Sequence, residues 1–281
     1  MKKIRIGGVP EHFNYAWKRC IENEEFENSE LEVSWQDFPG GTGALNEALR
    51  NNTIDIAVIL TEGIVKDIIA GNPSKIAQVF VETPLLWGIH VAADSEYLDL
   101  PDLKNTTAAI SRPGSGSQLM AYVMAENLGW STKALKFETV QDIDGAVKAL
   151  TEDKAQYFMW EKFMTKPLVD KGIFRRIGNC PTPWSSFVIA VRNDFFESEK
   201  LAVEKLLQII NKETSGFKNI PNISETLASK FDQKVEDIEE WLTLTEWSQR
   251  QLTEKEVDNV QQKLIDLNLI PHKVETDKLL F

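Results

Sequence analysis

Short apolar segments alternate with helical patterns through much of the chain, and this alternation restricts the fold more than any other feature. Strands are predicted at 4–9, 31–37 and 54–60, and the segments 15–23 and 42–50 between them carry apolar residues at helical spacing. Strands that are connected through helices form layered sheets with parallel neighbours. The sequence therefore predicts an α/β protein.

A second layered unit follows a longer β-rich run at 76–93. Pro84 interrupts this run and argues against one continuous central strand, so we expect the chain to leave one sheet for another there. After Glu197 the pattern is helical almost to the end. The remaining predicted elements are strands at 107–111, 157–160 and 187–191 and helices at 119–128 and 143–150.

Charge and composition exclude several classes of partner. The chain has 43 Asp and Glu against 31 Lys and Arg, which gives a formal net charge of -12. A surface this acidic repels polyanions, so we expect no nucleic-acid partner, and no apolar stretch is long enough for direct membrane insertion. Cys20, Cys180 and the three histidines show no zinc-binding spacing, so no metal or cofactor is expected.

The most informative segment is 111–118, a serine- and glycine-rich turn between a predicted strand and a predicted amphipathic helix. Ser115 or Ser117 can cap that helix, and the N–H groups of its first turn can bind an anion. Arg112 can add a charge-assisted contact. The alternative is an ordinary capped turn. The candidate ligand-binding residues here are Arg112, Gly114, Ser115, Gly116 and Ser117.

A glycine segment at 38–43 has the same setting in the first unit. Thr42 is predicted to cap the helix that follows. The segment is no dinucleotide fingerprint, because Asn46 stands where the third glycine belongs, and no Gly-Lys-Ser/Thr follows it. It is either a turn or a ligand cradle, with Gly41, Thr42 and Gly43 as the candidate residues.

Three further loops, 10–14, 61–63 and 160–161, fall at predicted strand ends, where open α/β sheets contact ligands. Glu62 and Glu161 can accept hydrogen bonds from an amine or a pyrimidine, although solvated carboxylates are the default in an acidic chain. A single histidine such as His12 is more often structural. No motif assigns a catalytic residue. The candidates are Glu11, His12, Phe13, Asn14, Thr61, Glu62, Trp160, Glu161 and the loop tryptophan Trp184.

The order of these motifs resembles the type 2 periplasmic-binding-protein fold, specifically the alkanesulfonate/taurine and thiamine-pyrimidine-precursor binding group. The segment 160–163 is similar to that family's Trp-acid-Pro-aromatic signature, with Lys162 in place of the proline. The resemblance also includes the segments 7–14, 40–43, 55–57 and 111–117. It implies two lobes, each a mixed sheet flanked by helices: lobe 1 at 1–88 and 187–281, with C-terminal helices packed on it, and lobe 2 at 89–186.

The resemblance implies a solute-binding protein whose two lobes close on a small anionic or heteroaromatic metabolite, such as a sulfonate or a thiamine-pyrimidine precursor. One alternative is a cytosolic enzyme on the same fold, as in pyrimidine or menaquinone precursor synthesis, with His12 or Glu161 as acid/base. Another is an interaction protein that binds a partner through helices at 224–268. The sequence as written has no signal peptide and predicts a cytoplasmic location. If a leader has been removed, the location is periplasmic or extracellular, with an ABC transporter permease as partner.

Overall fold

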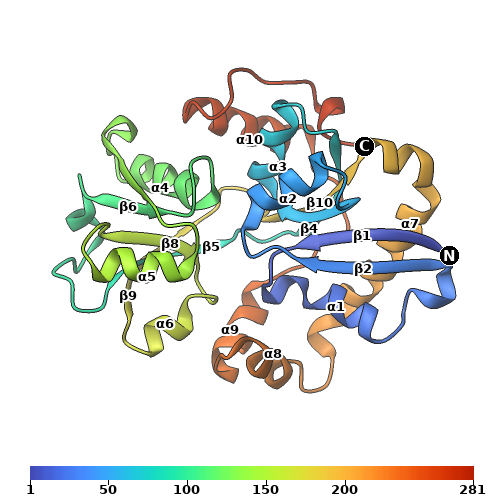
Figure 1. Cartoon of the computed structure of the whole chain (residues 1–281), viewed down its shortest axis with the longest axis horizontal. Coiled ribbons are helices and arrows are strands. Elements are labelled where there is room, and N and C mark those ends of the chain that lie inside the picture. Colours follow the sequence, from blue (N-terminus) through green and yellow to red (C-terminus); the bar gives the residue numbers. More distant parts are fainter. The chain divides into compact units, whose positions relative to one another are not determined.

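The computed structural model describes the backbone of residues 1–281 and every side chain except that of Asn28. The chain folds into two compact units (Figure 1): unit 1 contains Met1–Thr83 and Trp184–Phe281, and unit 2 contains Pro84–Pro183. The chain therefore crosses between the units twice. The crossings lie five and three residues before the boundaries 88/89 and 186/187 that the sequence suggested, so the strand β5 (Leu86–Ala92) belongs wholly to unit 2.

The sheet of unit 1 has the strand order β2-β1-β3-β10-β4. Its strands are β1 (Lys2–Gly8), β2 (Leu31–Asp37), β3 (Ile56–Leu60), β4 (Ser74–Val81) and β10 (Phe187–Arg192). β1 runs parallel to β2 and β3, whereas β10 runs antiparallel to β3 and β4. Every residue of β3 and β10 is buried, which explains why both read as uninterrupted apolar runs in the sequence.

Helices cover both faces of this sheet (Figure 1). α1 contacts α7, whereas α3 contacts α2 and α10. The helices after residue 192 all belong to unit 1, which confirms that the C-terminal helices pack on the first lobe. Unit 1 contains α1 (Tyr15–Glu22), α2 (Gly41–Arg50), α3 (Thr61–Ile69), α7 (Asn193–Gly216), α8 (Ile223–Phe231), α9 (Val235–Leu244), α10 (Glu254–Asp266) and the short 3-10 helices η1 (His12–Asn14), η2 (Glu27–Ser29), η5 (Phe217–Asn219) and η6 (Thr276–Lys278).

The sheet of unit 2 has the strand order β7-β6-β8-β5-β9. β6 runs parallel to β7 and β8, and β5 runs antiparallel to β8 and β9. Its core packs Phe158 and Phe174 against alanines of α5. The elements besides β5 are β6 (Thr107–Ile110), β7 (Lys136–Thr139), β8 (Tyr157–Glu161), β9 (Phe174–Pro181), α4 (Gly116–Asn127), α5 (Ile143–Thr151), α6 (Lys166–Asp170), η3 (Leu100–Leu103) and η4 (Thr132–Ala134).

The two sheets share one plan. In each sheet three parallel strands lie side by side, and the strand that comes first in the chain lies between the other two. The next strand in the sheet is antiparallel to them, and it begins just after the chain has crossed from the other unit. β5 fills this position in unit 2 and β10 fills it in unit 1. The predicted fold class, an α/β protein with a mixed sheet and flanking helices in each lobe, is confirmed.

The sequence analysis missed several elements. The edge strands β7 and β9 were not predicted, because both are half-exposed and carry charged residues instead of an apolar run. The helix α4 begins at Gly116, three residues earlier than predicted. It is also less amphipathic than predicted, because its buried residues lie on most of its sides.

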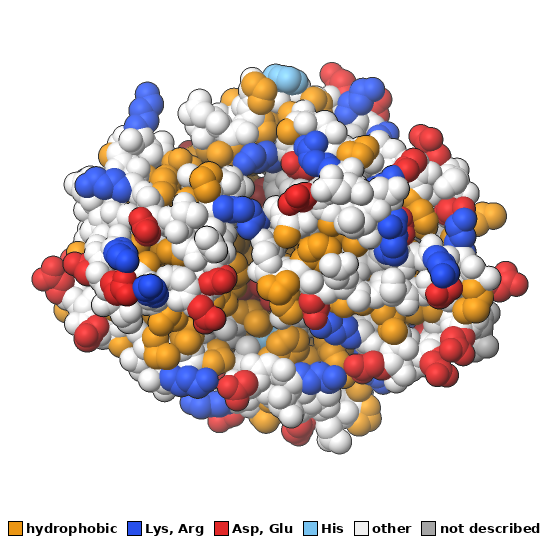
Figure 2. Space-filling view, viewed as in Figure 1, with side chains coloured by type: hydrophobic (Ala, Val, Ile, Leu, Met, Phe, Trp, Pro, Cys, Tyr) orange, Lys and Arg blue, Asp and Glu red, His pale blue; other side chains and the backbone are white. Residues whose placement is uncertain are grey.

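The visible surface carries charges of both signs. Figure 2 shows Lys and Arg side chains interspersed with Asp and Glu side chains on the displayed face, with hydrophobic side chains between them. On this face neither sign of charge is gathered in one large area. Among the helices that the structure describes, none combines the length and apolar character that a bilayer span requires.

Candidate functional site

The ends of several strands meet at one edge of the sheet in unit 1. β1, β2 and β3 are parallel, so their carboxyl ends share this edge. β10 begins here and β4 ends here, since Phe187 lies opposite both Leu60 and Val81. We call it the carboxyl edge of unit 1, the usual ligand-binding edge of open α/β sheets. The connecting segments at this edge are 9–14, 38–40, 82–83 and 184–186, and the first turn of α3 at 61–62 also lies here.

Glu62 lies at the centre of this edge. The Trp184 indole Nε1 donates a hydrogen bond to Glu62 Oε2 at 2.7 Å, and the hydroxyl of Thr61 donates to the carbonyl oxygen of Ser185 at 2.6 Å. Glu62 is only 2% exposed, and its Oε1 has no hydrogen-bond partner among the described residues. Burial raises the pKa of Glu62 to about 7, although the Trp184 hydrogen bond opposes the shift.

The segment 61–63 is not the loop that the sequence suggested. It forms the first turn of α3. The prediction of a loop was wrong, because α3 follows β3 without a connecting residue. The absent side chain of Gly63 makes room for Thr42, since a Cβ on Gly63 would lie 2.1 Å from Thr42 Cγ2.

The glycine segment brings the start of α2 against α3. Thr42 does not cap α2 as predicted: the N-cap position belongs to Gly40, and Gly41 takes a left-handed conformation with φ of +66° that favours glycine. The side-chain amide of Asn46 donates to the carbonyl oxygen of Gly63 at 3.2 Å. Gly41, Thr42 and Gly43 therefore form the first turn of α2, beside the helix that carries Glu62.

His12 is a core residue of unit 1. Its ring is fully buried and contacts the rings of Phe231 and Trp241, with centroid distances of 4.6 and 5.0 Å. Its Nε2 is hydrogen-bonded to the side-chain amide of Gln233 at 2.8 Å. Burial lowers the pKa of His12 to about 3, so the ring is neutral at physiological pH. The structure supports the structural interpretation of this histidine.

The rest of the segment 9–14 is divided between core and edge. Phe13 is buried against Phe187, and the side-chain amide of Asn14 donates to the carbonyl oxygen of Val9 at 2.9 Å, which closes the loop. Glu11 differs from these residues because it is partly exposed. Desolvation nevertheless raises the pKa of Glu11 to about 7. Glu11 is therefore the residue of this loop best placed to meet a solute.

Unit 2 has an equivalent carboxyl edge, where β6, β7, β8 and β9 end and β5 begins. The serine turn follows β6 here and is held by its own hydroxyl groups. Ser115 is the N-cap of α4 and accepts from Gln118 N at 3.4 Å. The Ser115 and Ser117 hydroxyl oxygens lie 3.0 Å apart, and Ser117 Oγ accepts from Ser111 N at 3.0 Å. Of the two predicted caps, Ser115 is the one used.

Arg112 and the glycines complete this turn. Gly114 has a φ of +78°, and its N–H donates to Gln118 Oε1 at 2.6 Å. Arg112 is half-buried, its carbonyl oxygen accepts from Ser115 N at 3.1 Å, and burial lowers its pKa. Gly116 begins α4. Arg112 thus lies in the turn that leads into α4, three residues before the N-cap of this twelve-residue helix.

Trp160 and Glu161 end β8 at the same edge. Glu161 is buried, and its Oε2 accepts hydrogen bonds from the backbone N–H groups of Phe163 and Met164 at 2.8 and 2.7 Å. This carboxylate therefore shapes the turn after β8. Trp160 is partly exposed and stacks on Phe158, with ring centroids 5.4 Å apart.

Sequence reasoning missed the polar residues next to the crossings in unit 1. Glu82 follows β4 and receives two hydrogen bonds from Arg250, which also binds Glu256. Arg250 lowers the pKa of Glu82. Ser186 precedes β10, is fully buried, and has a hydroxyl without a partner among the described residues. No local pattern reveals these roles, because Glu82 and Arg250 are 168 residues apart in sequence.

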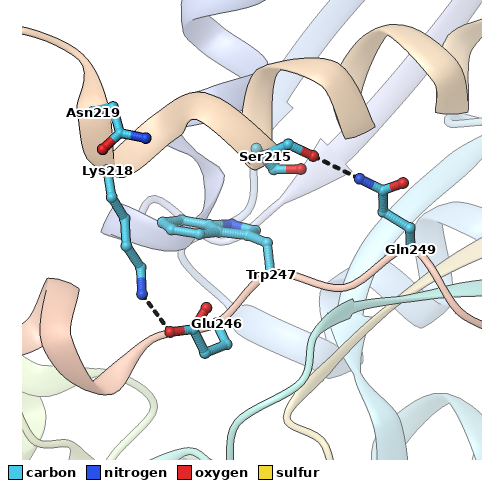
Figure 3. A pocket seen from close by; sticks show the side chains of 7 residues that line it. Ser215, Lys218, Asn219, Glu246, Trp247 and Gln249 are labelled. Atoms are coloured by element: carbon cyan, nitrogen blue, oxygen red, sulfur yellow. Dashed lines mark hydrogen bonds and ion pairs between the residues drawn. The ribbon is translucent and has the colours of Figure 1, made fainter.

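A separate cavity of about 220 Å³ lies in unit 1 beside the end of α7 (Figure 3). The Trp247 indole lies between two polar pairs there: Lys218 Nζ to Glu246 Oε1 at 2.5 Å and Gln249 Nε2 to Ser215 Oγ at 2.6 Å. The residues that line it include none of the predicted site residues. Because these side chains satisfy one another, we assign no ligand to this cavity.

The cysteines and the acidic residues do not form a metal site. Cys20 lies in unit 1 and Cys180 in unit 2, and both are buried. Within the part of the chain that the structure describes, no three His, Cys, Asp or Glu residues are grouped so that they could hold a metal ion.

Solved structures identify the fold. The Candida albicans CA3427 gene product, described as defining a new family with the generic periplasmic binding protein fold, is similar over 98% of this chain and 92% of its own, with a TM-score of 0.88 and 24% identity. The alkanesulfonate-binding protein SsuA from Xanthomonas axonopodis pv. citri, bound to MOPS, is similar over 100% of this chain and 98% of its own, with a TM-score of 0.84 and 17% identity. This chain has the type 2 periplasmic-binding-protein fold.

Further similarities agree with this assignment. The profile of the Ca3427-like PBP family matches residues 87–180, which run from β5 to β9 in unit 2. The ligand-binding component of an ABC-type import system from Staphylococcus aureus, with zinc bound, is similar over 100% of this chain and 97% of its own, with a TM-score of 0.79 and 13% identity. No curated protein sequence matches this chain. The resemblance to the type 2 fold is confirmed, whereas its thiamine-precursor part stays a prediction.

Proposed function

We propose that this chain is a solute-binding protein that binds a small anionic or heteroaromatic metabolite at the carboxyl edges of its sheets and releases it unchanged. The observation that carries the proposal is the position of the candidate residues. Glu62, Trp184, Arg112 and the serine turn all lie at the edge where open α/β sheets bind ligands, on two sheets built to one plan.

The serine turn supplies the chemistry for an anion. The N-terminus of α4 carries a partial positive charge, and the turn that precedes it contains Arg112. A guanidinium group binds a carboxylate, phosphate or sulfonate through charge-assisted hydrogen bonds. The partly exposed ring of Trp160 at the same edge can stack on a flat ligand.

The similar solved structures support a binding role. One is described as an alkanesulfonate-binding protein and another as the ligand-binding component of an ABC-type import system. We extend this role to the present chain because its candidate residues lie at the carboxyl edges of its two sheets. The expected closure of the lobes on the solute is part of the same proposal.

The enzyme alternative loses the residues on which it was based. His12 is buried among aromatic rings, and its pKa of about 3 means that it does not take up a second proton at neutral pH, so it is a poor general base. Glu161 is engaged by two backbone N–H groups. We therefore propose no reaction for these two residues.

Native mass spectrometry of protein purified without denaturant tests the proposal, followed by release and identification of any bound molecule. We expect a stoichiometric small molecule that is bound again when added back and is recovered unchanged. Arg112→Ala is expected to weaken an anionic ligand by about 2 kcal/mol, roughly 30-fold. Lys133→Ala is the matched control, since Lys133 is exposed in η4 before the amino end of β7.

Two results would contradict the proposal: consumption of the released molecule by the purified protein, or equal affinity in the Arg112 and Lys133 variants. We also propose an ABC transporter permease as the partner of an exported form. Fractionation of the native organism followed by cross-linking tests this part. Recovery in the cytoplasm, without a permease cross-link, would remove the transporter role and leave solute binding in place.

A further inference from the structure

Three buried acceptor oxygens without partners among the described residues belong to segments at the carboxyl edge of unit 1. Two of them are Glu62 Oε1 and Ser186 Oγ. Glu62 comes just after the end of β3 and Ser186 just before the start of β10, and these two strand ends are paired through Leu60 and Phe187. Asn14 Oδ1, in the loop after the neighbouring strand β1, is a third such oxygen. Each of the three residues is less than a tenth exposed.

Such oxygens are unfavourable unless a donor reaches them. A buried acceptor without a partner costs about 1 to 3 kcal/mol, and native proteins satisfy nearly all of their buried polar groups. Glu62 is the most costly of the three, because an ionised carboxylate needs several donors. Trp184 supplies one of them, at Oε2, and thereby directs Oε1 away from the indole.

These atoms share one chemical property. A carboxylate oxygen and an amide oxygen only accept hydrogen bonds, and a serine hydroxyl can accept as well as donate. The complementary solute surface is therefore rich in N–H donors. The raised pKa of Glu62, about 7, agrees with this picture, because a positively charged donor would restore the interactions that burial removes.

We propose that the solute presents an amino group, either an alkyl ammonium or an exocyclic amine on a heteroaromatic ring, to Glu62 Oε1. The inference rests on the proposed function and narrows its ligand class. A solute without an N–H donor, such as a simple alkanesulfonate, lacks the group that this subsite would recognise.

Paired probes test this subsite on the full chain. Taurine and ethanesulfonate differ in one amino group, as do 4-aminopyrimidine and pyrimidine, and each is titrated up to 50 mM. The reporter is the Trp184 indole N–H signal in a nitrogen-proton NMR spectrum, because that group donates to the same carboxylate. We expect the amino member of at least one pair to bind at least ten-fold more tightly and to move this signal.

Two variants separate the subsite from general effects. Glu62→Gln is expected to reduce the preference for the amino member to three-fold or less, because the amide removes the charge. Glu47→Gln makes the same chemical change at an exposed position of α2 and is expected to leave the preference unchanged. Thermal melts of both variants verify folding. If Glu62→Gln does not fold, Glu62→Asp replaces it, because aspartate keeps the charge. Glu62→Asp is expected to lower the affinity for the amino member.

Several outcomes would overturn the inference. Equal binding of both members of each pair would do so, as would a preference that survives Glu62→Gln. A molecule released from native protein that lacks an N–H group would overturn the amino subsite and leave solute binding intact. Failure of every probe to bind, together with an empty native protein, would overturn both proposals.

Discussion

Protonation of His12 is expected to make unit 1 less stable in acid. The folded pKa is about 3 and the unfolded value about 6.5, so between these values the unfolded chain binds more protons, and stability falls as the pH falls. At pH 5 nearly every unfolded chain carries a charged imidazole, whereas the folded ring stays neutral among Phe231 and Trp241. The loss due to His12 between pH 7 and pH 5 is about 2 kcal/mol, because each pH unit below the unfolded pKa contributes about 1.4 kcal/mol.

Urea unfolding of the wild type and of His12→Gln at pH 7 and pH 5 isolates this contribution. The variant is expected to be less stable at both values, but the difference from the wild type shrinks by about 2 kcal/mol at pH 5, because the variant has no imidazole to protonate. Val257→Ala removes buried apolar atoms in α10, a helix that makes no ring contact with His12, and should lower the free energy of unfolding by the same amount at both values. If the wild type and His12→Gln show parallel pH dependence, His12 is solvated in the native protein and the argument fails.

Three further substitutions probe the supports of the two edges by urea unfolding. Gly145→Ala is expected to lower the free energy of unfolding by about 3 kcal/mol, because the added Cβ would lie 1.8 Å from the carbonyl oxygen of Val140. Gly216→Ala, where no neighbour lies within 4 Å, is its control and should be nearly neutral. Ser115→Ala should cost about 1 kcal/mol through loss of the α4 cap, and an unchanged midpoint would mean that the cap is dispensable. Arg250→Met should cost about 1 to 2 kcal/mol by unpairing two carboxylates, and a cost that does not shrink in 1 M NaCl would contradict an ionic origin.

The sequence predicted elements whose burial follows a simple period. β3 and β10 are buried on both faces and stand out as apolar runs. β7 and β9 lie at sheet edges, where one side of the strand meets water, and their charged residues hide the strand pattern. The start of α3 was missed because a helix that follows a strand without a connecting residue leaves no turn in the sequence.

Candidate residues could be found by their place at strand ends, but their partners could not. Glu62 was a candidate because it follows a predicted strand, whereas the indole that orients it lies 122 residues later in the chain. His12 was a candidate for the same reason, and helices more than 200 residues away bury it. Strand ends are local properties of a sequence, and the tertiary contacts that decide between core and site are not.

The late arrival of β10 in the sheet of unit 1 has a consequence for synthesis on the ribosome. β3 and β4 are not paired with each other, so both keep an unpaired edge until β10 is made. The nascent chain must add about 110 residues after β4 first, which takes on the order of 5 to 20 seconds at typical translation rates. Unit 2, whose residues 84–183 are continuous, is complete before then. A nascent chain stalled with residue 186 just outside the ribosome should therefore show protease resistance confined to unit 2, while the open strands of unit 1 depend on chaperones until translation resumes.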